Sequence, residues 1–478
     1  MSRNRRFPRM LLLAALLCAS FASAAVPPTA AAADHVYRVD SARDTGGGTQ
    51  AACQDTIATN KSCTLRQALL QAASDGGTSE IRFIIPRTPP DPDWGYDAVS
   101  GTWTISPTTA LPPISTNDTT ILGKGFFTPQ IVIDGSRVPG GSAVGLRITS
   151  SNDIISKLAV VNFDRAGTNG VGILISGASA QNNQILQSAF QGNSHAGIKI
   201  DASASNNIIG AEGEFNIIGD NGTGIRLTNA NTNTIQGNFI GLGLNAGSFV
   251  PLGNNGDGIW LDNSDGNTIG GEGDARNVIS ANDKAGVLLS NGSASNNVIG
   301  NFIGTDEIGL ADLGNGQDGV QIVDGATNNT ISGGDFTHSV ISGNGGYGVL
   351  ISDNGTDGNK VIGAFIGVTD DGLGALPNTL GGVRIRDDAA NNTVGGAGQG
   401  NVISGNGGYG VALGGPGGST QIFSNTIATN FIGLGFDGTT MLANSAGGVL
   451  LDSGSNQNRV GGASAALQNV IAGNGGPG

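Results

Sequence analysis

The sequence has few of the residues on which catalysis most often depends. Its 478 residues include only 3 histidines and 3 cysteines, aromatic residues make up 5%, and charged residues make up 13%. His35, His195 and His338 are too few and too scattered to predict a Ser/His/Asp triad or a zinc site. No apolar run reaches the ~20 residues that cross a bilayer as a helix. These shortages disfavour histidine-based catalysis and a transmembrane helix.

Two sequence periods are also missing. Glycine is abundant, with 82 residues, but it does not recur at every third position, which excludes collagen. No 3.6-residue apolar period runs through the repeated part of the chain, so we expect little helix there. With 38% apolar residues the chain is too hydrophobic for ordinary disorder. We therefore predict a folded chain that is poor in helix and rich in turns.

The N-terminus has the pattern of an export signal. Arginines precede an apolar run over residues 10–21, and the small residues Ala22, Ser23 and Ala24 follow. We predict a signal peptide over residues 1–24 and a disordered leader over 25–33, with cleavage after Ala24 or after Ala33. The mature protein is then secreted or held at the cell surface, and it has no transmembrane segment.

Export also changes the net charge of the mature chain and determines which cysteines remain in it. Removal of the signal peptide, with its four arginines, takes the formal net charge from −14 to −18, which disfavours nucleic acids and anionic membranes as partners. Cys18 is expected to be removed with the same segment. Cys53 and Cys63 remain in an oxidising compartment, where we expect them to form a disulfide; two inert thiols are the alternative.

Internal repetition is the strongest signal in the chain. The string NFIG starts at residues 238, 301 and 430, with AFIG at 364, and NVIS starts at 277 and 401. Two shorter segments fall within each of these units, each made of glycine, Val or Ile, any residue, then Ile or Leu. The ten glycines that open such segments are Gly172, Gly197, Gly224, Gly258, Gly286, Gly319, Gly348, Gly382, Gly410 and Gly448.

Each glycine-led segment alternates apolar and variable residues, which is typical of a strand. Ile259 and Leu261 are expected to point inward and Trp260 outward. One such strand cannot bury its apolar face alone, so successive coils must stack in parallel. We therefore predict an all-β fold, a right-handed parallel β-helix over residues 151–478 with three short strands per coil. At one corner, stacked amides are expected at Asn267, Asn329, Asn392 and Asn458.

Four phenylalanines are expected on the outside of this shaft: Phe239, Phe302, Phe365 and Phe431. A loop is inserted after each of them, and its leucines lie close to the ring in sequence. We expect the loops to fold back and cover the rings. The alternative is an exposed aromatic ladder that stacks on carbohydrate.

Residues 34–150 differ from the repeats and are predicted to form an N-terminal cap and the first coils. They hold one helical run, residues 65–73, with Thr64 as its cap. The segment CTLRQAL at 63–69 resembles the CSLREA motif of secreted bacterial β-helix proteins, with Thr64 and Gln67 as departures. The resemblance extends through the later coils and implies a pectate-lyase-like (pectin-lyase-like) fold, PbH1 repeats and export. It implies no activity, because that family has no agreed catalytic residues.

A search for known chemistry finds no complete site. The aspartate set of polygalacturonase-type hydrolases is missing, because Asp387 and Asp388 stand in the wrong order and spacing. Asp306, Asp370 and Asp437 recur in the inserted loops, where turn formation is favoured over a structural calcium site. We predict no cofactor, with calcium possible but unsupported by a specific motif. His338 matches Arg276 in the repeat and is expected in a solvated turn.

One patch is a candidate carbohydrate-binding site. Outward positions of three neighbouring coils offer an aromatic residue beside charged groups, the mixture that sugar recognition uses. Its residues are Lys199, Asp201, Arg226, Trp260 and Asp262. The alternative is a solvated face of mixed charge. Leu288, Leu350, Ala412 and Leu450 stand at equivalent positions of later coils, so the patch is expected to be local.

The function hypothesis is a secreted or cell-surface protein, non-catalytic and adhesin-like, whose partner is an extracellular glycan or cell-surface component. The alternative is an extracellular polysaccharide lyase or glycoside hydrolase that acts on acidic polysaccharide. We expect a monomer. The last ten residues match a coil from Asn401 onward that continues in the earlier copy, so we expect that the native chain extends further.

Overall fold

The computed structural model describes residues 33–44, 53, 63–85, 95–125, 128–140, 143–334, 338–414, 422–452 and 454–478. The predicted signal peptide, residues 1–24, and almost all of the predicted leader lie outside these ranges. Within them, no helix combines the length and the apolar character needed to cross a bilayer.

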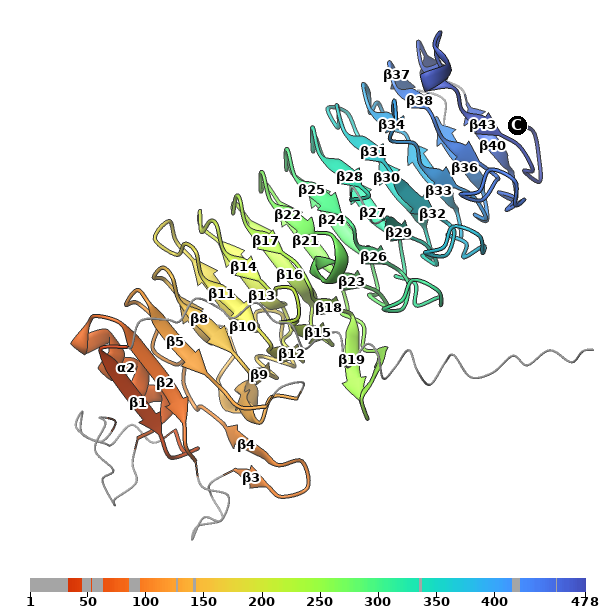
Figure 1. Cartoon of the computed structure of the whole chain (residues 1–478). Helices are drawn as coiled ribbons and strands as arrows, with labels where there is room; N and C mark the ends of the chain where they lie inside the picture. Colours follow the sequence, from red (N-terminus) through yellow and green to blue (C-terminus); the bar gives the residue numbers. More distant parts are fainter. Residues whose placement is uncertain are drawn as a thin grey trace, which may run out of the picture.

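The chain forms a right-handed parallel β-helix, as predicted from the sequence (Figure 1). Three sheets form its faces: sheet A with 14 strands, sheet B with 14 and sheet C with 11. All their strand pairs are parallel except the first pair of sheet B, which is antiparallel. Sheet A runs from β1 (His35–Val39) to β42 (Arg459–Val460), and sheet B from β3 (Tyr96–Asp97) to β43 (Val470–Ile471). The strands of sheet C are β7 (Val144–Ile148), β10 (Val171–Ser176), β13 (Ala196–Asp201), β16 (Thr223–Thr228), β21 (Ile259–Asp262), β24 (Val287–Ser290), β27 (Val320–Ile322), β30 (Tyr347–Ile351), β33 (Gly381–Ile385), β36 (Tyr409–Leu413) and β40 (Gly447–Leu451).

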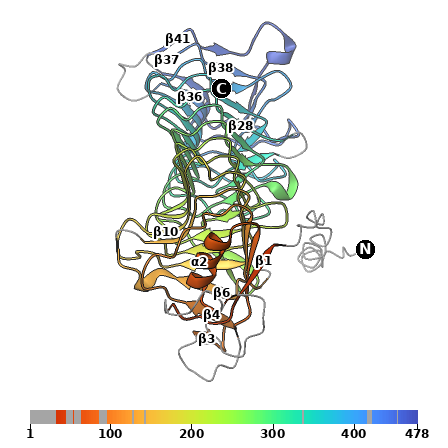
Figure 2. The ribbon, with the colours of Figure 1, turned by 90° about the vertical axis from the view of Figure 1, so that its left-hand side faces the viewer.

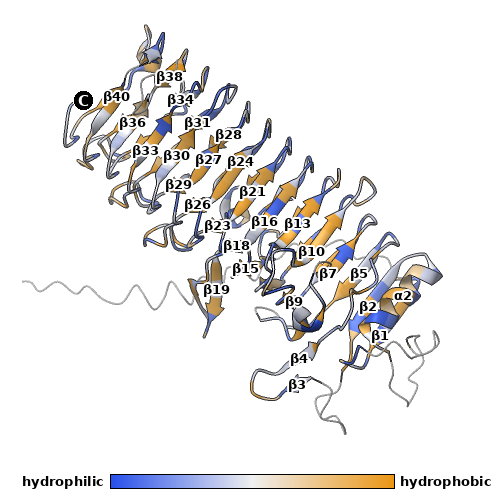
Figure 3. Ribbon diagram, turned by 180° about the vertical axis from the view of Figure 1, so that it is seen from behind, coloured by the Kyte–Doolittle hydropathy of each residue, from blue (hydrophilic) through white to orange (hydrophobic). Residues whose placement is uncertain are grey.

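Each complete coil visits sheets A, B and C in turn, and the alternation within each strand builds the core. In β21, Ile259 and Leu261 are 0% exposed, whereas Trp260 faces outward and is half-buried. The register aligns Ile259 with Ile225 on one side and with Val287 on the other, so inward side chains stack along the axis. Figure 3 shows the apolar strands of this face. One aliphatic core therefore runs through the shaft.

Asparagine ladders line all three corners, rather than the single corner expected from the sequence. At the corner before sheet A, Nδ2 of Asn267 donates to Oδ1 of Asn296 at 3.1 Å. At the corner before sheet B, Asn238 donates to Asn277 in the same way at 3.0 Å. The corner before sheet C repeats the contact from Asn254, at 2.8 Å. Because most of these amides are fully buried, each ladder satisfies the corner backbone along the axis.

The CTLRQAL segment stabilises the N-terminal end of the shaft. Helix α2 (Leu65–Asp75) lies against β1 at this end (Figure 2), and Thr64 and Gln67 form a capping box, which confirms the expected cap. Arg66 makes two hydrogen bonds to Asp44, of 2.8 and 2.9 Å, and also donates to the carbonyls of residues 109 and 110. Thr64 and Gln67 therefore cap the helix, and Arg66 ties it to neighbouring segments.

Cys53 and Cys63 are joined as a disulfide, with a Cα–Cα distance of 4.9 Å, as expected. Replacing both cysteines with alanine should lower the free energy of unfolding by about 2–3 kcal/mol, because the bridge closes a ten-residue separation in the unfolded chain. Urea unfolding with and without reductant measures this effect. The double variant should be insensitive to reductant, and an equal response of both proteins to reductant would contradict the expectation.

Candidate functional site

The five predicted patch residues lie together on the outer face of sheet C. The register places Lys199 of β13 opposite Arg226 of β16, and Arg226 opposite Trp260 of β21. Asp201 and Asp262 end the first and last of these strands. The next residue in the row is Leu288, so the patch is local, as expected.

The side chains of the patch contact one another. Nζ of Lys199 lies 2.9 Å from Oδ2 of Asp201, and a guanidinium nitrogen of Arg226 lies 2.9 Å from Oδ2 of Asp262. These four side chains are only 16–24% exposed. The guanidinium also lies 3.7 Å from the centre of the Trp260 ring, in cation–π contact. Charged groups of opposite sign are thus paired across this face.

The indole of Trp260 is held from a second side. Its Nε1–H donates to Oγ of Ser290 on β24 at 2.9 Å. One ring face is covered by Arg226 and the indole nitrogen is bonded, so the ring is fixed in place before any ligand arrives. A preorganised aromatic side chain loses little conformational entropy on binding.

His195 and Asp257 are two further residues of this region. The sequence analysis named His195 only as a scattered histidine and did not consider Asp257. His195 immediately precedes β13, and burial lowers its pKa, an effect that the positive charges of Arg226 and Lys199 increase. Asp257 lies two residues before β21, and burial raises its pKa although the Ala285 N–H donates to it. Both precede the glycine that opens a strand segment. The alternation used to assign outward residues starts after that glycine, so it does not include them.

The sequence expectation for His338 is correct in register and wrong in environment. The ring of His338 stacks on Phe365, with centroids 3.8 Å apart, as the guanidinium of Arg276 lies 4.1 Å from the centre of Phe302. His338 is half-buried rather than in a solvated turn. Burial lowers its pKa, and the nearby carboxylate of Asp370 raises it.

The three loop aspartates are not equivalent, contrary to the sequence expectation. Asp306 accepts the Leu310 and Ala311 N–H groups, and Asp437 accepts those of Thr439 and Thr440, but the two turns differ in register. Asp370 instead lies in a half-buried position near Arg276 and His338. In the described part of the chain, no group of three or more His, Cys, Asp or Glu side chains could hold a metal ion.

The covering loops do pack over the outer phenylalanines. Phe302 is 0% and Phe365 is 3% exposed, and they belong to a second apolar cluster outside the shaft. Gly309 and Gly372 sit in the loops directly against these two rings. Adjacent loops are joined by hydrogen bonds, one of them from the Asp370 N–H to the Gly309 carbonyl at 3.0 Å. An exposed aromatic ladder along the whole row is excluded by this packing.

The fold and the paired aromatic and charged side chains define an extended β-helix with a ligand-sized polar patch on one face. The model of the family described as "Periplasmic copper-binding protein (NosD)" matches residues 130–312, a segment that contains the whole patch. No curated protein matches the chain.

Among solved structures, the chain is similar to the A-module of mannuronan C-5 epimerase AlgE6 from Azotobacter vinelandii, at 16% identity and a TM-score of 0.46, covering 87% of this chain and 94% of that one. It is similar to the periplasmic alginate epimerase AlgG at 15% identity and a TM-score of 0.40, covering 80% and 74%. The polysaccharide lyase Pedsa3628 of family PL6 from Pseudopedobacter saltans follows at 12% identity and a TM-score of 0.37, covering 94% and 91%. At such values these likenesses carry no argument about activity.

Proposed function

We propose that the protein is a glycan-binding β-helix that works outside the cytoplasm and binds its ligand through the sheet C patch. The observation that carries the proposal is the row Lys199, Arg226 and Trp260, which the register places on three adjacent strands. A fixed aromatic ring beside paired donors and acceptors suits the apolar faces and hydroxyl groups of a sugar. The export signal expected at residues 1–24 and the periplasmic description of the matched family support the location.

Replacing Trp260 with alanine should weaken glycan binding at this patch by about tenfold or more, because an aromatic anchor is lost from a contact region. Binding is measured on an array of uncharged and uronic-acid oligosaccharides. Leu288→Ala is the matched control, since Leu288 occupies the same row one strand further along. Unchanged binding of every bound glycan by the Trp260 variant would remove the patch from consideration.

A second candidate, a lyase that acts on uronic-acid polymers, is favoured by His195. Burial and the charges of Arg226 and Lys199 lower the pKa of His195, and a base near two cations is the combination that β-elimination uses. The cations would neutralise the substrate carboxylate and the imidazole would take the C5 proton. The C4–O bond would then break, with its electron pair leaving on the oxygen, which takes a proton from water.

The lyase has a direct test. The purified protein is incubated with uronic-acid polymers, and absorbance of the unsaturated product is followed in the ultraviolet. If the protein is a lyase, product should form and His195→Ala should abolish it. Absence of product across the polymers would leave binding as the function.

Copper binding is not part of the proposal. The matched family carries copper in its description, but the donors present here do not fit such a site. The two described cysteines are joined to each other, and the histidines His35, His195 and His338 lie on separate coils. No role is therefore assigned to that metal.

A further inference from the structure

The outer face of sheet B carries a repeated stacking arrangement. Three of the four outward phenylalanines are in contact with a side chain that stands one or two residues before the sheet B strand of the preceding coil. Phe215 contacts the edge of Phe239, with centroids 5.1 Å apart. At the next two such positions, Arg276 lies over Phe302 and His338 stacks on Phe365.

The fourth phenylalanine lacks this partner. In the same register, the residue that would cover Phe431 is Gly400, directly before Asn401 of the ladder. A Cβ placed at Gly400 would collide with the carbonyl of Thr429, so the backbone itself keeps the position free of a side chain. Phe431 is half-buried, as is Phe239, whereas Phe302 and Phe365 are nearly inaccessible.

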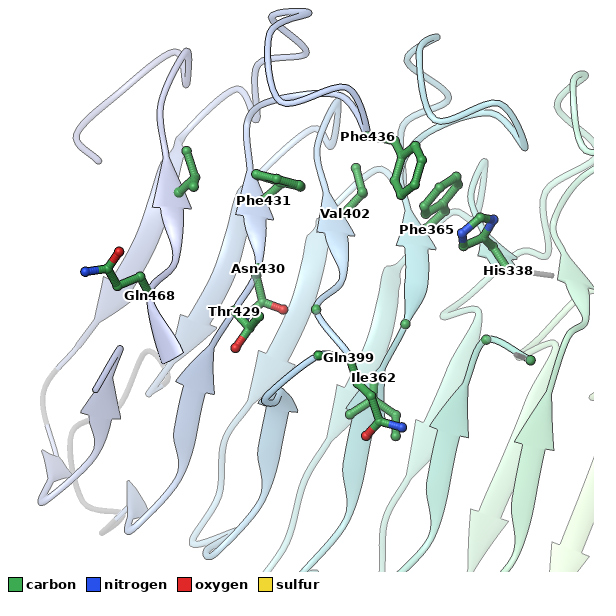
Figure 4. A pocket seen from close by; sticks show the side chains of 16 residues that line it. His338, Ile362, Phe365, Gln399, Val402, Thr429, Asn430, Phe431, Phe436 and Gln468 are labelled. Atoms are coloured by element: carbon green, nitrogen blue, oxygen red, sulfur yellow. The ribbon is translucent and has the colours of Figure 1, made fainter. Parts of the chain in front are cut away.

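A cavity of about 580 Å³ opens at this position, within the range of ~300–1,000 Å³ common for small-molecule sites. Figure 4 shows Phe431 beside Val402, with Gln399, Thr429 and Gln468 around the same opening. Gln399 and Gln468 are exposed on opposite sides of the short Ala428–Asn430 turn. The cavity thus combines an aromatic face with amide donors and acceptors.

The charge of the lining selects the ligand class. Among the described residues that line this cavity there is no Lys, Arg, Asp or Glu, and the single titratable side chain is His338. Burial lowers the pKa of His338, which favours its neutral form. A charged ligand would find no counter-ion here, and the net charge of −14 opposes an anionic one. A flat, uncharged molecule with many hydroxyl groups fits both the ring and the amides.

We propose that the cavity beside Phe431 is a binding site for the pyranose rings of an uncharged glycan, separate from the sheet C patch. One sugar face would stack on the open face of Phe431, and Gln399 and Gln468 would bond its hydroxyl groups. The other rings of the row are covered: Phe302 and Phe365 are nearly inaccessible, and Phe239 stacks on Phe249 with centroids 3.7 Å apart.

The test measures binding of uncharged hexasaccharides, namely cello-, laminari-, manno- and xylohexaose, by titration calorimetry on the full chain, with oligogalacturonate as the charged comparison. Phe431→Leu retains an apolar side chain but removes the flat ring, and it should weaken binding of an uncharged hexasaccharide at least tenfold. Gln399→Ala should weaken it severalfold. Phe302→Leu is the matched control, because its ring lies in the same row and is covered.

Two variants separate this site from the proposed function. Trp260→Ala should leave the Phe431-dependent binding unchanged, so failure of one site does not imply failure of the other. The proposal is overturned if no uncharged hexasaccharide binds, if Phe431→Leu and Phe302→Leu bind equally well, or if only oligogalacturonate binds. Because Phe431→Leu is conservative, its unfolding midpoint serves to show that the coil remains folded.

Discussion

Replacing Asn296 with alanine should lower the free energy of unfolding by about 4 kcal/mol. Oδ1 of Asn296 accepts the Asn267 backbone N–H at 2.8 Å, and its Nδ2 donates to the Ser264 carbonyl at 2.9 Å. Both backbone groups would lose these partners in a fully buried corner, and each buried polar group left unsatisfied costs about 1–3 kcal/mol. The lost amide also leaves a small void.

The neighbouring residue provides the control. Asn297 follows directly in β25 (Asn297–Ile299), but its side chain is exposed. Asn297→Ala should change the free energy of unfolding, measured in urea, by less than ~0.5 kcal/mol, as is usual for surface positions. Hydrogen exchange should show the added opening of Asn296→Ala concentrated in the coils around β25, because solenoid coils interact mainly with their neighbours. Equal effects of the two substitutions would mean that the ladder contributes little.

The coil architecture could be predicted because its information is local. Alternation around Ile259 and Leu261 determines which side is buried, and the recurring glycine-led segments show that the unit repeats. The ladders at the other two corners were not predicted, although Asn277 and Asn282 belong to a repeated segment of the sequence. Both lie inside strings that were interpreted as strand and turn, and only the register shows that their amides meet those of adjacent coils.

The candidate sites were less predictable, because they depend on contacts between coils. Lys199, Arg226 and Trp260 could be aligned by counting from their glycines, and they do lie in one row. Their mutual pairing could not be foreseen, since it depends on side-chain reach across strands. The opening at Phe431 is still harder to see, because it arises from the glycine at position 400 of the preceding coil.

Asp153 is the first rung of an amide ladder, and replacing it with asparagine should stabilise the protein at neutral pH. Asp153 is 0% exposed and occupies the rung before Asn183, whose Oδ1 accepts the Asp153 N–H at 2.8 Å. Burial raises the pKa of Asp153 from 3.8 to about 7, although hydrogen bonds from Ser150 and Thr119 lower it. An asparagine would carry no charge and could donate to Asn183 as the other rungs do.

The sign of the pH dependence follows from the raised pKa. Below pH 3.8 Asp153 is protonated in both the folded and the unfolded state. Between that value and about pH 7 the unfolded chain loses the proton first, so ionisation favours unfolding and the wild type loses stability as pH rises. The full loss is about 4 kcal/mol, at ~1.4 kcal/mol per pKa unit. The advantage of Asp153→Asn should therefore be small at pH 4 and near its maximum at pH 8.

Urea unfolding of both proteins at pH 4, 6 and 8 measures this difference. Asp265→Asn is the control, because Asp265 is exposed and an amide there can still accept the Ala294 N–H. It supplies the baseline for an exchange of carboxyl for amide at an exposed position. An Asp153→Asn advantage that stays constant from pH 4 to 8 would mean that the carboxyl is ionised throughout. The Ser150 and Thr119 donors would then outweigh the burial of its charge, and the first rung of the ladder would be a stabilised anion rather than an imperfect amide.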